Sequence, residues 1–178
     1  MIVLETERLV LRHLGPDDAD FIVALLNDPA FLRFIGDRSV RTPDDARGYI
    51  QNGPVESYAR NGFGLYLVER REDGAALGMC GLLKREVLSD VDIGFAFMPA
   101  FRGGGYAREA AAATLEHARD VLGLPRIVAI VSPDNEASIG LLGRLGFTFE
   151  RWVRMSADEE EIRLFSVELR PDPPAAAV

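Results

Sequence analysis

Three consecutive glycines, Gly103 to Gly105, separate a predicted strand from a predicted helix, and they constrain this chain more than any other feature. In the preceding sequence VDIGFAFMP, large apolar residues alternate with smaller or more polar ones, which predicts a strand ended by Pro99. An Ala-rich sequence follows the glycines and predicts a helix. The first N–H groups of a helix lack intrahelical partners, and glycines let a ligand approach the main chain. The order strand, glycine turn, helix therefore predicts an anion site, most often one for phosphate.

The bulk properties narrow the classes of protein. A chain of 178 residues with a net charge of −8 argues against nucleic-acid binding and mildly favours cationic partners such as amines or basic peptides. Cys80 is the single cysteine, so an intrachain disulfide is excluded and a buried reduced thiol is expected. The N-terminus MIVLETERLVLR has acids where a signal peptide has basic residues, and no apolar segment is long enough to span a bilayer. We therefore expect a cytoplasmic protein without membrane contact.

The remaining pattern predicts the element order β-α-α-β-β-β-α-β-α-β-β in a single α+β (mixed α/β) domain over residues 1–170, with 171–178 as a disordered tail. Short turns connect most neighbouring strands and demand antiparallel pairing, whereas the helix after the glycines makes the flanking strands parallel. Gly53-Pro54 should kink or divide the predicted helix 42–60. The expected strands are 8–14, 64–70, 77–84, 89–98, 126–131, 147–155 and 162–169, and the clearest helices are 42–60 and 104–122.

Several interpretations of the glycine turn compete. A P-loop needs Lys and Ser or Thr after its last glycine, but Tyr106-Ala107 stands there. A dinucleotide fingerprint needs Gly or Ala at its sixth position, which Arg108 occupies, and it needs a mostly parallel sheet. A turn without a ligand is a third interpretation, although each glycine costs about 1 kcal/mol of helix propensity relative to Ala.

The fourth interpretation is a resemblance. RGGGYA, from Arg102 to Ala107, has the form Arg/Gln-x-x-Gly-x-Gly/Ala, and it resembles the pyrophosphate loop of the GNAT superfamily of acetyl-CoA-dependent N-acetyltransferases. TERLVLR, PDDAD, LGMCGL around Gly78 and PDNEASIGLLGRLGF look like the branch that contains the ribosomal-protein alanine N-acetyltransferases. The resemblance covers residues 4–170. It implies a central, mostly antiparallel twisted sheet of about seven strands, one parallel pair splayed around CoA, and helices on both faces.

The resemblance also assigns residues to the acetyl-CoA site. The strand before the glycines is expected to carry a bulge and to bind the pantetheine arm. Arg102 is expected to shape the turn, and Arg108 either adds charge or is solvated. Asn135 and Ser138 match the family's Asn-x-x-Ser positions, with Asn135 reaching the CoA arm, capping its helix, or both. The implied cofactor-binding residues are Phe97, Met98, Arg102, Gly103, Gly104, Gly105, Tyr106, Ala107, Arg108, Asn135 and Ser138.

The chemistry follows from the acceptor. A primary amine is mostly protonated at neutral pH, so a base must remove its proton before it can attack. Asp92, just before Ile93-Gly94-Phe95, is the first choice for this base, although its side chain could equally face water. Asp90 and Glu86 are the alternative candidates for the base. A backbone N–H near Phe97 could stabilise the oxyanion. Leu142 stands where many relatives have a Tyr acid, so Ser138 or water is left to protonate the thiolate.

We therefore expect an N-acetyltransferase that moves an acetyl group from acetyl-CoA, its co-substrate, to a primary amine by direct attack in a ternary complex. A protein N-terminal α-amine is one candidate acceptor, and no metal is required. A non-catalytic acyl-CoA-binding or regulatory module and a nucleotide-binding module are the alternatives. Acidic residues between 31 and 61 and in the last hairpin could attract a cationic acceptor. The protein is expected to be a monomer or a homodimer.

Overall fold

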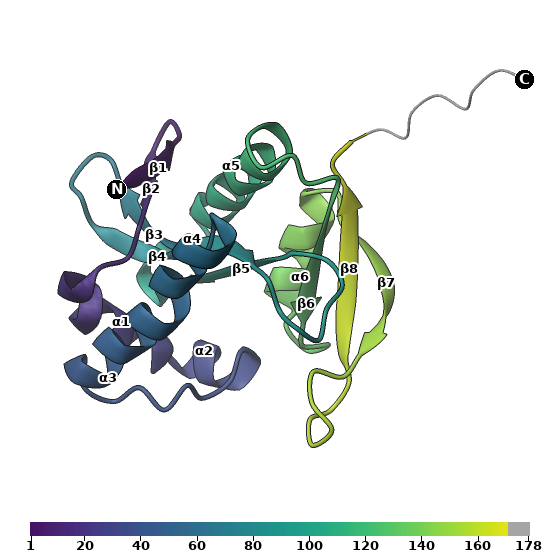
Figure 1. The fold of residues 1–178 in the computed structure, drawn as a ribbon, viewed down its shortest axis with the longest axis horizontal. Helices are drawn as coiled ribbons and strands as arrows, with labels where there is room; N and C mark the ends of the chain where they lie inside the picture. Colours follow the sequence, from purple (N-terminus) through teal and green to yellow (C-terminus); the bar gives the residue numbers. More distant parts are fainter. Residues whose placement is uncertain (171–178) are drawn as a thin grey trace, which may run out of the picture.

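A computed structural model describes residues 1–170, so the predicted tail 171–178 lies outside the described part. In that part, eight strands form one sheet in the order β1-β2-β3-β4-β5-β6-β8-β7 (Figure 1). The strands are β1 Ile2–Glu5, β2 Leu9–Arg12, β3 Leu65–Arg70, β4 Ala76–Leu83, β5 Asp92–Phe97, β6 Arg126–Val131, β7 Thr148–Val153 and β8 Ile162–Glu168.

The pairing confirms the predicted mixed sheet. Neighbouring strands are antiparallel except β5 and β6, which are parallel. The sheet has one strand more than the seven expected, because β1 pairs with β2 through Leu4↔Leu11 and Glu5↔Val10. Only four residues long, β1 shows too little alternation to be recognised without its partner.

The helices are α1 Ala19–Leu26, α2 Pro29–Phe34, α3 Pro43–Ile50, α4 Glu56–Asn61, α5 Tyr106–Asp120 and α6 Glu136–Arg144. The helix α3 begins where the sequence predicted a helix start, and Thr42 caps it because its side chain accepts the N–H of Asp45. A π-helical segment, Gln51–Val55, contains Pro54 and joins α3 to α4, which is the irregularity that Gly53-Pro54 predicted. No helix in the described residues is long and apolar enough to cross a bilayer.

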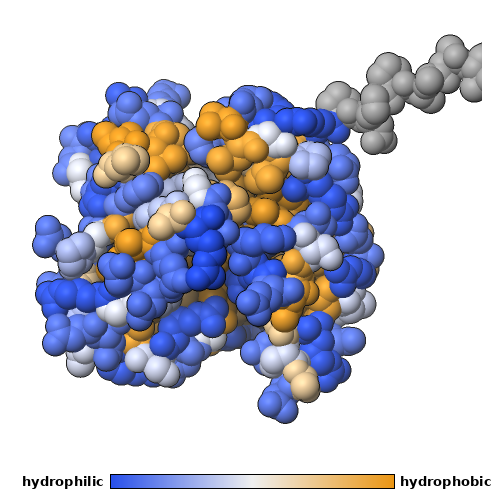
Figure 2. Space-filling model, viewed as in Figure 1, coloured by the Kyte–Doolittle hydropathy of each residue, from blue (hydrophilic) through white to orange (hydrophobic). Residues whose placement is uncertain are grey.

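Helices cover both faces of the sheet, as predicted (Figure 1). On one face α5 packs its small and apolar residues, Ala110, Ala111, Leu115 and Ala118, against the central strands. On the other face α1 and α3 pack around Leu67 and Met79. Figure 2 shows that one side of the molecule is mostly hydrophilic, with hydrophobic residues visible in the hollows between its elements.

The sheet opens between β5 and β6. These strands have one registered pair, Asp92↔Val128, and they diverge beyond it (Figure 1). The register of β5 on β4 is continuous from Gly78↔Phe97 to Leu83↔Asp92. The bulge expected in β5 is therefore absent from these described residues, and the splay arises where β5 and β6 separate after their single pair.

Candidate functional site

The glycine turn has the backbone geometry that only glycine adopts readily. Gly103 and Gly105 have φ of 81° and 82°, and Gly105 is the N-cap of α5. An L-residue in this left-handed region costs roughly 1–2 kcal/mol. The turn therefore needs these glycines to leave the first N–H groups of α5 facing outward, where an anion can bind them.

Arg8 from the β1–β2 connection holds the outer side of the turn. Its Nη1 donates to the carbonyl of Gly104 at 3.0 Å, and its Nε donates to the Glu109 carboxylate at 2.7 Å. The guanidinium also lies 4.3 Å from the centre of the Tyr106 ring. The sequence placed Arg8 in a motif but gave it no role, because its partners are about a hundred residues away in the chain.

Arg102 holds the inner side of the turn. Its Nε donates to the carbonyl of Phe97 at 3.0 Å, and its Nη2 lies 2.6 Å from the carboxylate of Asp28. Asp28 is buried and also caps α2 by accepting the N–H of Phe31. These contacts fix the turn relative to β5 and α2, in agreement with the shaping role predicted for Arg102. Sequence reasoning missed Asp28, whose Asn-Asp-Pro context indicated only the end of a helix.

A cavity of about 630 Å³ lies between the glycine turn, α2 and α6. Two of the predicted cofactor contacts do not line it. The N–H of Met98 donates to the carbonyl of Leu77 at 2.9 Å, so it is directed toward β4. The carbonyl of Gly104 accepts from Arg8 on the other side of the turn. The predicted residues that do line it are Phe97, Arg102, Gly103, Gly105, Tyr106, Ala107, Arg108, Asn135 and Ser138, and Arg144 joins them from α6.

The edge of β5 supplies backbone donors to this cavity. Successive peptide groups of a strand point to opposite edges, and the N–H of Met98 points to β4. The N–H groups of Phe97 and Phe95 therefore point to the opposite edge, where β5 and β6 have separated. Phe97 lines the cavity, and the role of its N–H as an oxyanion donor stays a prediction.

The start of α6 forms another wall of the same cavity. Asn135 caps the helix by accepting the N–H of Ser138 at 3.3 Å, so the expected capping role is confirmed. Leu142 is 1% exposed and packs in the core under α5. The side chain at position 142 therefore faces the core, and Leu142 does not line this cavity.

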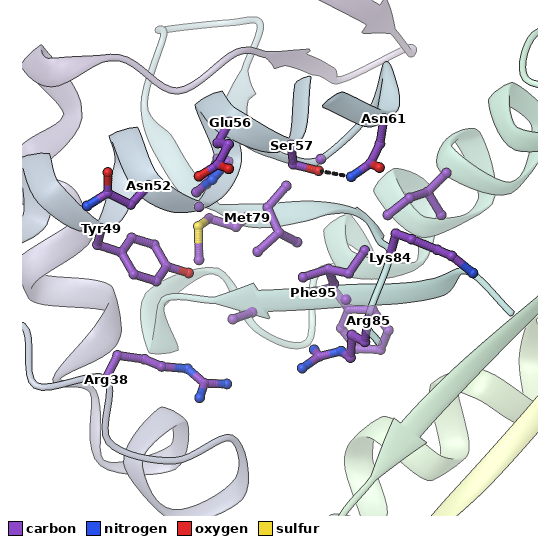
Figure 3. Close-up of a pocket in the computed structure, with 18 of the residues that line it drawn as sticks. Arg38, Tyr49, Asn52, Glu56, Ser57, Asn61, Met79, Lys84, Arg85 and Phe95 are labelled. Atoms are coloured by element: carbon purple, nitrogen blue, oxygen red, sulfur yellow. Dashed lines mark hydrogen bonds between the residues drawn. The ribbon is translucent and has the colours of Figure 1, made fainter. Parts of the chain in front are cut away.

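A second cavity, of about 440 Å³, lies between α2, the bent α3–α4 helix and β3 to β5 (Figure 3). Its polar lining includes Arg38, Tyr49, Glu56 and Arg85, and its apolar lining includes Met79. The second cavity meets the first across the middle of β5, because both are lined by Phe31, Ile35, Phe95 and Ala96. The two cavities are therefore neighbours that share a wall formed by α2 and the middle of β5.

Asp92 lies beside this second cavity, beneath Arg85. Its side chain is 1% exposed, which excludes the solvated alternative, and Nε of Arg85 lies 3.1 and 3.2 Å from its two carboxylate oxygens. Burial raises the pKa of Asp92 to about 6, while the charge and hydrogen bond of Arg85 act in the opposite direction. A carboxylate with this pKa can accept a proton near neutral pH, but Asp92 lines neither cavity, and its role as the base stays a prediction.

The other titratable candidates have structural partners or lie apart. Asp90 binds Nε of Arg126 at 3.1 Å, and Glu86 is exposed on the β4–β5 connection. Cys80 is buried, as expected, and burial raises the pKa of its thiol to about 12. Within residues 1–170, no three His, Cys, Asp or Glu side chains lie close enough together to hold a metal ion.

Comparisons with known proteins agree with this geometry. The family described as "Acetyltransferase (GNAT) domain" matches residues 8–148. The "Uncharacterized N-acetyltransferase YoaA" of Bacillus subtilis is 30% identical over 153 residues, which are 85% of this chain and 86% of that protein. The crystal structure of an acetyltransferase from Agrobacterium tumefaciens strain C58 superposes with a TM-score of 0.78 at 25% identity and covers 93% of both chains.

The ribosomal L7/L12 α-N-protein acetyltransferase RimL, solved in complex with coenzyme A, has the same fold with a TM-score of 0.80. Its identity to this chain is 19%, over 94% of this chain and 98% of RimL, so it supports the fold alone. The sequence motifs, the splayed parallel pair and the family match agree with one another. This chain belongs to the GNAT family and is an acetyltransferase.

Proposed function

We propose that this acetyltransferase uses acetyl-CoA to acetylate a primary amine, with both substrates bound at once. The observation that carries the proposal is the junction of the two cavities at Phe95 and Ala96. The first cavity reaches the glycine turn, and the second extends from the shared residues toward α3, α4 and β4. A thioester in the first and an amine in the second can meet at this junction for direct attack.

The residues of the first cavity fit CoA. The N–H groups from Gly103 to Ala107 would bind the pyrophosphate, and Arg108 and Arg144 would add positive charge. The exposed edge of β5 at Phe97 would bind the amide groups of the pantetheine arm, and Asn135 borders the same path. RimL, which shares the fold, was solved with coenzyme A, and this supports the same donor here.

The chemistry requires few protein groups. The amine loses a proton to a base, for which Asp92 acting through water is our proposal, and its nitrogen attacks the acetyl carbonyl carbon. The N–H of Phe97 would donate to the resulting oxyanion. The nitrogen then loses its second proton to water, and the carbon–sulfur bond breaks. The CoA thiolate takes a proton from water, directly or through Ser138, which regains its own proton from water. The products are the N-acetylated amine and free CoA.

The test is release of CoA thiol when purified protein is mixed with acetyl-CoA and a panel of peptides, polyamines, amino acids and other small amines. A protein N-terminal α-amine belongs in the panel, because RimL is an α-N-protein acetyltransferase. We expect thiol release that depends on the amine. Calorimetric binding of CoA without thiol release from any amine would support the non-catalytic alternative, and an absence of CoA binding would refute the proposal.

A further inference from the structure

The second cavity has a charge opposite to that of the whole chain. Four cationic side chains line it, Arg38, Arg60, Lys84 and Arg85, whereas Glu56 is the sole carboxylate in its lining. Glu56 is already paired with Arg60 one helical turn away. A protein with a net charge of −8 therefore presents a positive surface where its second substrate would bind. A polyamine would meet repulsion there, whereas an anionic group would be attracted.

Two of these arginines are arranged to bind an anion. Arg85 uses Nε for the buried Asp92, which orients the guanidinium and leaves its two terminal nitrogens for another partner. Arg38 is exposed and has no ion-pair partner among residues 1–170. Figure 3 shows both guanidinium groups directed toward the part of the cavity that the Tyr49 hydroxyl faces.

Tyr49 completes this cluster. Its hydroxyl forms no hydrogen bond within the described residues, so it remains available as a donor. Burial raises the pKa of Tyr49, and the positive charges of Arg38 and Arg85 oppose that shift. All three residues line the second cavity. We define Arg38, Tyr49 and Arg85 as the anion cluster of the second cavity.

Three of the four acidic residues between 31 and 61 lie away from the second cavity, and the fourth, Glu56, is the carboxylate paired with Arg60. Asp37 binds Arg41 and Asp44 binds Arg47, while Asp45 caps α3. None of these three carboxylates lines the second cavity. They belong to the surface of the α2–α3 region, and the expectation drawn from their number in the sequence does not apply to the cavity.

We propose that the acceptor is a small primary amine that also carries a carboxylate, such as an apolar α-amino acid; this rests on the proposed function. The carboxylate would bind the anion cluster, because planar guanidinium groups match carboxylate geometry and the Tyr49 hydroxyl can add a hydrogen bond. The amine would then lie toward Phe95 and Ala96. A volume of about 440 Å³ suits a small molecule, and Phe31, Ile35, Met79 and Leu82 suit an apolar side chain.

The experiment compares apolar α-amino acids with their carboxamides, using the full chain, acetyl-CoA and thiol release. Each pair shares its side chain and primary amine and differs in the carboxylate. The α-amine of a carboxamide has a lower pKa than that of the amino acid, so more of it is unprotonated at a given pH. We therefore calculate kcat/KM from the concentration of the unprotonated amine. We expect at least one amino acid to exceed its carboxamide by about 10-fold or more, as the loss of a charge-assisted hydrogen bond predicts.

The variant Arg38→Gln should raise KM for that amino acid by about 10- to 100-fold and leave its carboxamide unaffected. Arg38 is exposed, so folding should not depend on it. Arg47→Gln is the matched control, since Arg47 lies on α3, carries the same charge and lines neither cavity. A comparable KM increase in the control would overturn the assignment to Arg38.

Two results would overturn the inference while leaving the proposed function intact. One is that carboxamides or polyamines react as well as the amino acids, and the other is that only peptides react. If no amine releases thiol, the proposed function fails, and calorimetry with N-acetylated apolar amino acids tests the anion cluster by itself. Binding that Arg38→Gln weakens and Arg47→Gln preserves would support the cluster; an absence of binding would refute it.

Discussion

Replacing Asp92 by asparagine tests the electrostatics of the site through protein stability. Burial raises the pKa of Asp92 from an ordinary 3.8 to about 6, and its side chain is 1% exposed. The folded state therefore binds a proton at a higher pH than the unfolded chain does. The stability that this proton contributes is present at low pH and is lost as the pH rises from about 4 through 6.

The magnitude follows from these two pKa values. Between pH 7.5 and pH 4.5 the wild type should gain about 2 kcal/mol of unfolding free energy relative to Asp92→Asn, which cannot take up this proton. For a domain of this size that is a relative shift of roughly 4–8 °C in Tm. Urea unfolding at both pH values, followed by circular dichroism, measures the difference directly.

Asp73 provides the control, because a hydrogen bond from Arg70 lowers the pKa of Asp73 to about 2. Its folded pKa lies below the unfolded value, so the variant Asp73→Asn should show a small difference of the opposite sign. If the wild type and Asp92→Asn change in parallel between pH 7.5 and 4.5, burial does not raise the pKa of Asp92, and the reasoning about this carboxylate is refuted.

Other substitutions test the remaining parts of the site. Gly105→Ala should cost roughly 1–2 kcal/mol and weaken CoA binding in calorimetry. Gly104→Ala, which has no positive φ and whose Cβ would meet only the edge of the Tyr106 ring at 3.3 Å, should have smaller effects; equal effects would contradict the geometry. Asp28→Ala removes the cap of α2 and should cost about 1–2 kcal/mol in urea unfolding; an unchanged midpoint would contradict this. If Asp92 is the base, the variant Asp92→Asn lowers kcat at neutral pH, with partial recovery at high pH. If Asp92 only orients Arg85, the same variant raises KM for the acceptor and leaves the shape of the pH–rate profile unchanged.

The sequence predicted the fold because its strongest signals are local. The glycine turn, the Thr42 cap and the apolar run of β6 each determine their own segment, and the helix between β5 and β6 determines which strands are parallel. The strand β1 was missed because four residues carry little periodicity. The expected bulge in β5 came from the resemblance, and the register shows instead that β5 stays paired with β4 while β5 and β6 separate after one pair.

The residues lining the first cavity were predicted more completely than those lining the second. The glycine turn and the Asn135 motif are contiguous in sequence, so a resemblance could assign them. Arg8, Asp28, Arg38 and Arg85 act through partners or a shared cavity that folding creates, and no spacing in the chain indicates them. The net charge has the same limit, since a value of −8 did not predict that cationic side chains would outnumber carboxylates in the lining of the second cavity.

A crystal structure of the protein with CoA tests the central claim most directly. The account predicts the pyrophosphate within hydrogen-bonding distance of the N–H groups from Gly103 to Ala107, and the sulfur beside Phe95 and Ala96 where the two cavities meet. A pyrophosphate bound elsewhere, or a sulfur directed away from the second cavity, would contradict it.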